Sequence, residues 1–165
     1  MGSATRDELY DTDILTWSER QAALLRRLAA GERVNASIDW SNVIEEIESV
    51  GRSERQACES LLRQALVHVL KLHLAPTSEA APHWRGEVIG FLADASDRFS
   101  PSMRQPLDLP RLFAKARRQV LASGAASAAA NRLPETCPFT VDELLDDNVD
   151  IVALETKLRD HGSEA

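Results

Sequence analysis

The sequence lacks several features by which common protein classes are identified. No uninterrupted apolar run approaches the ~20 residues of a membrane-spanning helix, so we expect no membrane span. The two cysteines, Cys58 and Cys137, lie far apart without C-x-x-C spacing, so the sequence predicts neither a zinc knuckle nor a dithiol redox pair. No segment alternates polar and apolar residues as a strand does, and no Asn-Gly or Asp-Gly hairpin signal occurs.

The sequence is also short of positive charge. Its 19 Lys and Arg residues face 26 Asp and Glu residues, and the net charge of -7 argues against broad affinity for phosphate backbones. The polar first residues lack the apolar segment of a signal peptide, so we expect a reducing, cytoplasmic location. We therefore expect a protein partner or a homo-oligomer rather than nucleic acid or a membrane.

What the sequence does contain is a series of amphipathic helices. Apolar residues at helical spacing predict one all-α domain, a helical bundle of about five to six helices. We expect residues 1–11 to be a flexible tail, residues 12–146 the bundle, and residues 147–165 a C-terminal helical extension. The alanine-rich residues 123–131 fit a thin helix or a linker, and we slightly favour the helix.

The stretch from Asp39 to Lys71 carries the strongest signals. Asp39 has the position of a helix N-cap, and the helix it starts carries Val43, Ile44, Ile47 and Val50 on one face. Gly51 can end that helix, and Ser53 opens a capping box for a second helix over 54–74. This pattern predicts two antiparallel neighbours joined by a short turn.

Such packing would bring carboxylates close to a basic ridge. Glu46 and Glu48 flank the first apolar face, while Gln64, His68 and Lys71 form one polar ridge on the second helix. A carboxylate beside His68 could exchange protons, and a divalent metal bound by Glu46, Glu48 and His68 could act with Lys71 in catalysis.

The same residues fit a structural role. A buried polar network of Asp39, Glu45, Glu46, Gln64 and His68 would hold the two helices in register, and we favour this brace over a catalytic or metal site. We expect no organic cofactor, and a divalent metal stays possible.

Several short motifs follow one another along nearly the whole chain. They are Tyr10-x-x-Asp13-x-x-x-Trp17, Asp39 with Glu45-Glu46-Ile47-Glu48, Gly51-Arg52-Ser53-Glu54, Leu66-x-His68-Val69-Leu70-Lys71, Trp84-Arg85, Ser100-Pro101-Ser102 and Pro134-x-x-Cys137-Pro138-Phe139-Thr140. As a set they resemble the domain of unknown function 29 family, which is known chiefly from bacteria. The resemblance implies a small, mostly helical protein without an assigned activity.

The sequence contains no complete nucleophile, phosphate loop or metal motif. We therefore favour a binding or regulatory module without catalysis of its own. One alternative is a metal-dependent hydrolase of phosphoesters or nucleic acid that uses Glu46, Glu48, His68 and Lys71. A structural homo-oligomer is the other alternative, and it requires an apolar helix face that stays exposed.

Overall fold

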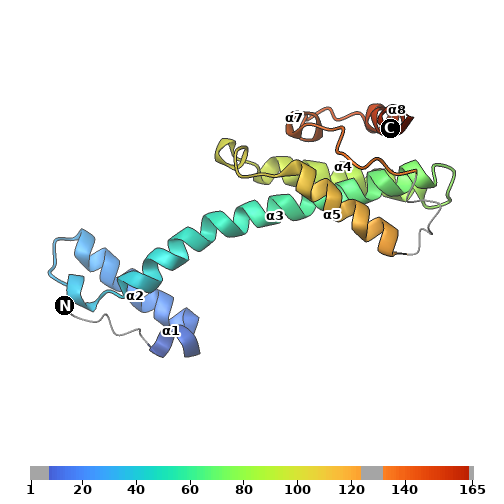
Figure 1. The fold of residues 1–165 in the computed structure, drawn as a ribbon. Helices are drawn as coiled ribbons and strands as arrows, with labels where there is room; N and C mark the ends of the chain where they lie inside the picture. The colour runs from blue at the N-terminus through green and yellow to red at the C-terminus, as the bar shows by residue number, and fades with distance from the viewer. Residues whose placement is uncertain (1–7, 124–131, 164–165) are drawn as a thin grey trace. The chain divides into compact units, whose positions relative to one another are not determined.

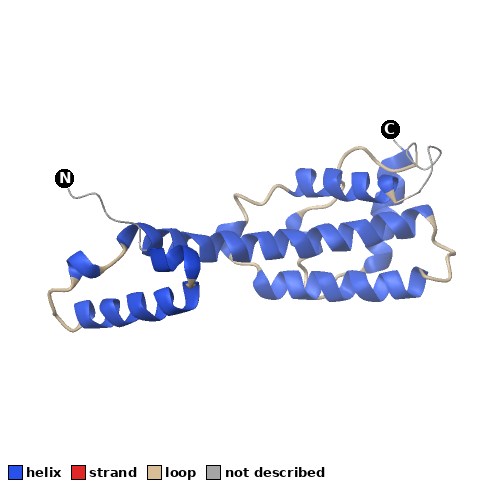
Figure 2. Cartoon of the chain, turned by 90° about the horizontal axis from the view of Figure 1, so that it is seen from below, coloured by secondary structure: helices blue, strands red, loops and turns tan. Residues whose placement is uncertain are grey.

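A computed structural model describes residues 8–123 and 132–163 of the chain, and every regular element in these ranges is helical (Figures 1 and 2). The predicted all-α fold is confirmed. In chain order the elements are α1 (Glu8–Thr12), α2 (Ile14–Ala29), the 3-10 turn η1 (Asn35–Ser37), α3 (Trp40–Leu74), α4 (Ala81–Arg98), the 3-10 turn η2 (Pro101–Met103), α5 (Leu109–Ala122), α7 (Val141–Leu144) and α8 (Ile151–Ser163).

The helices gather into two compact units that meet in the sequence between Ser53 and Glu54. The first contains α1, α2, η1 and the start of α3, and the second contains the remainder of α3 and all later elements. The predicted domain limits, 12–146 with an extension over 147–165, stay a prediction.

Local capping signals define the first unit. The carboxylate of Asp13 accepts a hydrogen bond from the Thr16 backbone N–H at 3.0 Å and starts α2. Gly31 follows α2 with a φ of 88°, the left-handed conformation expected of a C-terminal glycine. Trp17, Ile38 and Val43 form the buried core of this unit, so the chain segments before and within α3 close onto α2.

The turn that the sequence predicts at Gly51 is absent, and this prediction was wrong. Residues 40–74 form one continuous helix. A glycine inside a helix lowers its stability by only about 1 kcal/mol relative to alanine, and it stops a helix only where neighbouring contacts favour the left-handed conformation. Arg52 pairs with Glu48 one turn earlier, and Arg55 with Glu59 one turn later, so side-chain pairs at helical spacing continue through this region.

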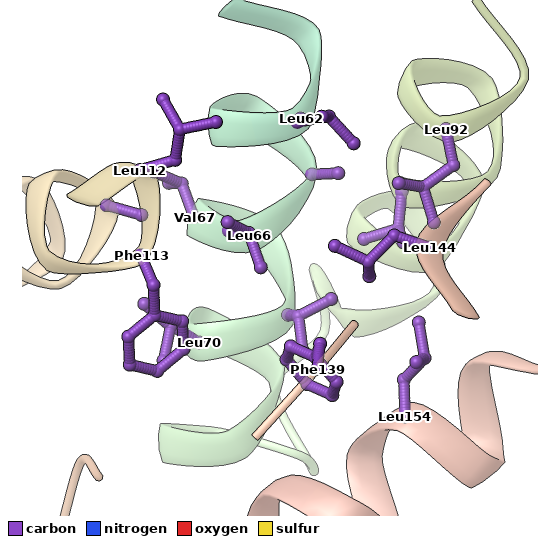
Figure 3. Close-up of a cluster of buried hydrophobic side chains, with 14 of the residues drawn as sticks. Leu62, Leu66, Val67, Leu70, Leu92, Leu112, Phe113, Phe139, Leu144 and Leu154 are labelled. Carbon is purple, nitrogen blue, oxygen red and sulfur yellow. The ribbon is translucent and has the colours of Figure 1, made fainter. Parts of the chain in front are cut away.

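The second unit is built around the C-terminal part of α3, where the sequence predicts a helix over 54–74. Figure 3 shows Leu62, Leu66 and Leu70 of α3 among side chains from the surrounding helices. Leu66 and Leu70 are fully buried. The residues that meet them in this core include Leu92 from α4, Leu112 and Phe113 from α5, Phe139, Leu144 from α7 and Leu154 from α8.

The later start and stop signals of the chain are close to the observed limits. Thr140 and Glu143 form a capping box at the start of α7, since each side chain bonds the backbone N–H of the other residue. Asp108 caps α5 through a 2.9 Å bond from the Arg111 backbone N–H. Residues 124–131 lie outside the described ranges, so the prediction of a helix or a linker there is not tested. Ser123, the last described residue before them, is the C-cap of α5.

Candidate functional site

The predicted site residues fall into different parts of α3. Glu45, Glu46 and Glu48 belong to the first unit, whereas His68 and Lys71 belong to the second. Because α3 continues through Gly51, the antiparallel packing that was expected to bring them face to face is not formed. Within residues 8–123 and 132–163 no three His, Cys, Asp or Glu side chains are grouped so as to hold a metal ion.

The carboxylates of the first unit have partners close by. Glu46 accepts a 2.6 Å hydrogen bond from the hydroxyl of Tyr10 and a 2.9 Å bond reaches its carbonyl from the Ser49 hydroxyl. Glu48 lies 3.4 Å from Arg52 at the surface, and Glu45 is exposed. Glu46 therefore fastens α1 to α3 rather than approaching an imidazole.

The carboxylate that contacts His68 comes from α4. His68 Nε2 lies 3.1 Å from Glu87 Oε2, and the other oxygen of Glu87 lies 3.4 Å from Nε2 of His83. Lys71, one turn after His68, places its ammonium 5.7 Å from the centre of the Trp84 ring. The polar ridge of α3 thus contacts α4 through His68 and Lys71. The positions of these residues around α3 do not by themselves predict which helix they contact. Gln64 is half-buried one turn before His68.

The surroundings of His68 favour its neutral form. Burial is the largest effect that lowers the pKa of His68 below its ordinary 6.5, the charge of Lys71 adds to it, and the charge of Glu87 opposes both. Nδ1 of His68 is buried and has no hydrogen-bond partner among the described residues. Protonation would place an unpaired N–H there, so near pH 7 His68 is a neutral donor that links α3 to α4.

The lowered pKa of His68 predicts a specific pH dependence of stability. A histidine whose pKa is lower in the folded protein adds stability above its unfolded pKa, and this stability is lost as the pH falls through the folded pKa. In His68→Gln, which keeps a donor for Glu87, the free energy of unfolding should therefore decline less between pH 7.5 and 5 than in the natural protein.

Chemical denaturation at each pH measures this slope. Glu87→Gln provides the matched comparison, because it removes the charge that raises the pKa of His68 and should make the decline steeper. If the free energy of unfolding declines equally with pH in all three proteins, folding does not lower the pKa of His68 and the prediction is wrong.

Asp39 occupies a buried network that the sequence only partly predicts. Its Oδ2 accepts hydrogen bonds from Asn42 Nδ2 at 2.6 Å and from the Trp17 indole at 3.3 Å, and Oδ1 accepts from the Ser41 hydroxyl at 3.0 Å. Its backbone N–H donates to Gln21 Oε1 at 3.0 Å. Burial raises the pKa of Asp39, but the hydrogen bonds outweigh this effect and the pKa is lowered. The hydrogen bonds of Asp39 thus join it to Trp17, Gln21, Ser41 and Asn42, and not to Glu45, Glu46, Gln64 and His68, with which the sequence grouped it.

Neither cysteine has the lowered thiol pKa of a nucleophile. Cys58 is fully buried beside the Ala95 carbonyl, and Cys137 is half-buried. Burial raises the pKa of both thiols, which leaves them protonated at neutral pH.

A polar groove of about 390 Å³ lies in the second unit. Two carboxylates line it beside the basic side chains. Glu59 pairs with Arg55 at 3.0 Å, and Asp108 caps α5. This mixture of signs does not define a ligand. The groove is lined by Arg55, Gln56, Glu59, Pro106, Asp108, Arg111, Leu112 and Lys115.

The most unusual surface belongs to the first unit. We use the term α3 stripe for Trp40, Ile44, Ile47 and Val50, whose exposed fractions are 38%, 53%, 68% and 64%. The sequence predicts Ile44, Ile47 and Val50 on one helix face together with Val43, yet of that face only Val43 is buried. From Ile44 to Ser53 no residue of α3 is buried. An apolar face of this kind is typical of an interaction surface.

None of the described helices is long and apolar enough to cross a membrane.

Comparison with known proteins places the sequence among helical domains without an assigned activity. Residues 9–149 match the family described as Domain of unknown function DUF29. A crystal structure of an α-helical protein of unknown function from Rhodospirillum rubrum is similar, with a TM-score of 0.67 and 28% sequence identity over 93% of this chain and 99% of that chain. No curated protein matches the sequence.

Proposed function

Because the chain belongs to the DUF29 family, which carries no assigned activity, its role must be inferred from its own surface, and we propose that it is a protein-binding module whose α3 stripe docks onto an amphipathic helix. The single observation that supports this proposal is the exposure of the α3 stripe. Scattered single apolar residues on a surface are ordinary, but four within eleven positions of one helix form a continuous patch.

The exposed segment needs an explanation in terms of energy. Each Å² of apolar surface removed from water contributes about 25 cal/mol, so leaving Ile44, Ile47 and Val50 in water forgoes stabilisation that the core residues of both units obtain. A helix segment with no buried residue gains little from its own chain, and isolated helices are marginal in water. A partner that covers the stripe would supply the missing contacts.

The spacing of the stripe indicates the chemistry of that partner. Trp40, Ile44 and Ile47 follow one another at intervals of four and three residues, the pattern with which one helix packs against another. Charged side chains border the stripe, with Glu48 and Arg52 close together on one edge. We infer an amphipathic partner helix with an apolar seam and charged edges.

Site-specific crosslinking in the native cell tests this proposal. A photoreactive phenylalanine analogue replaces Ile47, and in the control protein it replaces Glu45, which is exposed on the opposite side of the same helix turn. We expect a discrete protein adduct from position 47 and none from position 45.

A second substitution separates docking from folding. Ile44→Gln should change the free energy of unfolding by no more than about 0.5 kcal/mol, as expected of an exposed position, while it abolishes the adduct from position 47. Adducts that form equally from both positions, or persist in Ile44→Gln, would contradict docking through the stripe.

A further inference from the structure

We propose that the helix bound by the α3 stripe is the α3 of a second copy of this chain, and that the two helices run antiparallel about a two-fold axis beside Val50. This inference rests on the proposed function, since it names the partner of the same surface. It is carried by the distribution of charge and of side-chain size around residues 47–52.

The two edges of the stripe differ in chemistry. At about 100° per residue, Ile44, Ile47 and Gly51 lie along the middle, Glu48 falls on one edge and Val50 on the other. Arg52 lies on the same side as Glu48, and the two side chains approach to 3.4 Å. The stripe thus has one charged edge and one apolar edge.

This asymmetry selects the orientation of a second copy. When two antiparallel helices are related by a two-fold axis perpendicular to them, each edge of the stripe meets the same edge of the second copy. In a parallel pair, the charged edge of one copy meets the apolar edge of the other. With the axis beside Val50, Glu48 of each copy lies opposite Arg52 of the second copy, and the two Val50 side chains meet. A parallel pair would instead place Glu48 against Val50 and leave its charge without a partner from the second copy.

Gly51 supports close approach at the same place. A Cβ atom added at Gly51 would meet no atom within 4 Å, so no contact inside the chain requires a glycine there. Glycine nevertheless weakens a helix interior, and in this arrangement it leaves space for Ile47 of the second copy beside the helix backbone. A helix that approaches from outside therefore accounts for a residue that the folded chain itself does not need.

The size of the surface predicts a modest affinity. The exposed stripe measures on the order of a few hundred Å² on each copy, below the roughly 800 Å² that each partner contributes to a standard interface. We expect a dissociation constant on the order of 1–100 µM, in the range of weak, reversible dimers.

Charge reversal tests both the partner and the orientation. Glu48→Arg and Arg52→Glu each place like charges opposite one another in both symmetric contacts of a dimer, so each variant alone should dimerise at least ~10-fold more weakly in sedimentation equilibrium. Mixed in equal amounts, the two variants should recover dimerisation, because both contacts of the mixed pair are then of opposite sign. Asp94→Arg, which makes the same change of charge at an exposed position of α4 outside the stripe, is the matched control, and it should dimerise like the natural protein.

The outcomes distinguish this inference from the proposed function. A natural chain of 165 residues that remains monomeric at about 500 µM, or variants that fail to recover on mixing, would overturn the antiparallel dimer. If the adduct from position 47 then has the mass of the chain plus a different protein, the stripe is a docking surface for another partner and only the second copy is excluded. If neither dimer nor adduct forms, both proposals fail.

Discussion

Asp39→Ala should lower the free energy of unfolding of the first unit by at least about 3 kcal/mol. The substitution removes the carboxylate that accepts the hydrogen bond of the Asn42 backbone N–H at the start of α3, and such an N-cap typically contributes about 1 kcal/mol. It also leaves the buried Trp17 indole and the Asn42 amide without the carboxylate that accepts their hydrogen bonds, and each buried unsatisfied donor costs about 1–3 kcal/mol. Unfolding followed by tryptophan fluorescence, in a background in which Trp40 and Trp84 are replaced by Phe so that the signal comes from Trp17, measures the loss.

The matched control for Asp39 is the N-cap of α2. Asp13→Ala removes an exposed cap that bonds Thr16, so its effect should be clearly smaller than that of Asp39→Ala. Equal losses in the two variants would mean that Asp39 acts only as a helix cap and that its bonds to Trp17 and Asn42 contribute nothing.

Leu66→Ala should destabilise the second unit by about 2–5 kcal/mol. Leu66 is fully buried, and its truncation opens a cavity among side chains that are held on several helices and relax only in part. Natural domains are stable by about 5–15 kcal/mol, so this single change removes a large part of the total. Denaturant unfolding, followed by amide exchange in α4 and α5, measures the effect.

Ile89→Ala is the matched control for Leu66. Ile89 also carries a large aliphatic side chain on a helix of this unit, but half of it is exposed, so its truncation should change stability by about 0.5 kcal/mol or less. A loss at Ile89 as large as that at Leu66 would show that the exposed face of α4 is covered in solution.

The continuation of α3 through Gly51 shows that a helix boundary cannot be predicted from local residue types alone. Gly51 and Ser53 have the residue types of a helix end and a helix start, and yet α3 continues through both. Such signals permit a boundary without requiring one, because the outcome depends on whether the helical conformation is more favourable than the turn at that point. The capping box at Thr140 and the glycine after α2 have the same residue types, and there a helix does begin or end.

The candidate site was predictable in its residue types but not in its pairing. His68 was expected beside a carboxylate, and a carboxylate is there, but it belongs to Glu87 on α4. Any of several acidic residues has the right chemistry for this contact, and the choice among them depends on which helices become neighbours. The catalytic and metal roles considered for Glu46, Glu48, His68 and Lys71 depended on a helix pair that α3 does not form.

By itself, the sequence determined the all-α class, the family, the central helix of the second unit and the caps at Asp39 and Thr140. These features depend on groups within one or two helix turns of each other, or on the periodicity of one helix. Only the tertiary structure decided that Asp39 meets Trp17 and Gln21, which lie 22 and 18 residues away, and that Ile44, Ile47 and Val50 stay exposed. The physical reason is that periodicity defines an apolar face, whereas its burial depends on whether another segment of the chain reaches that face.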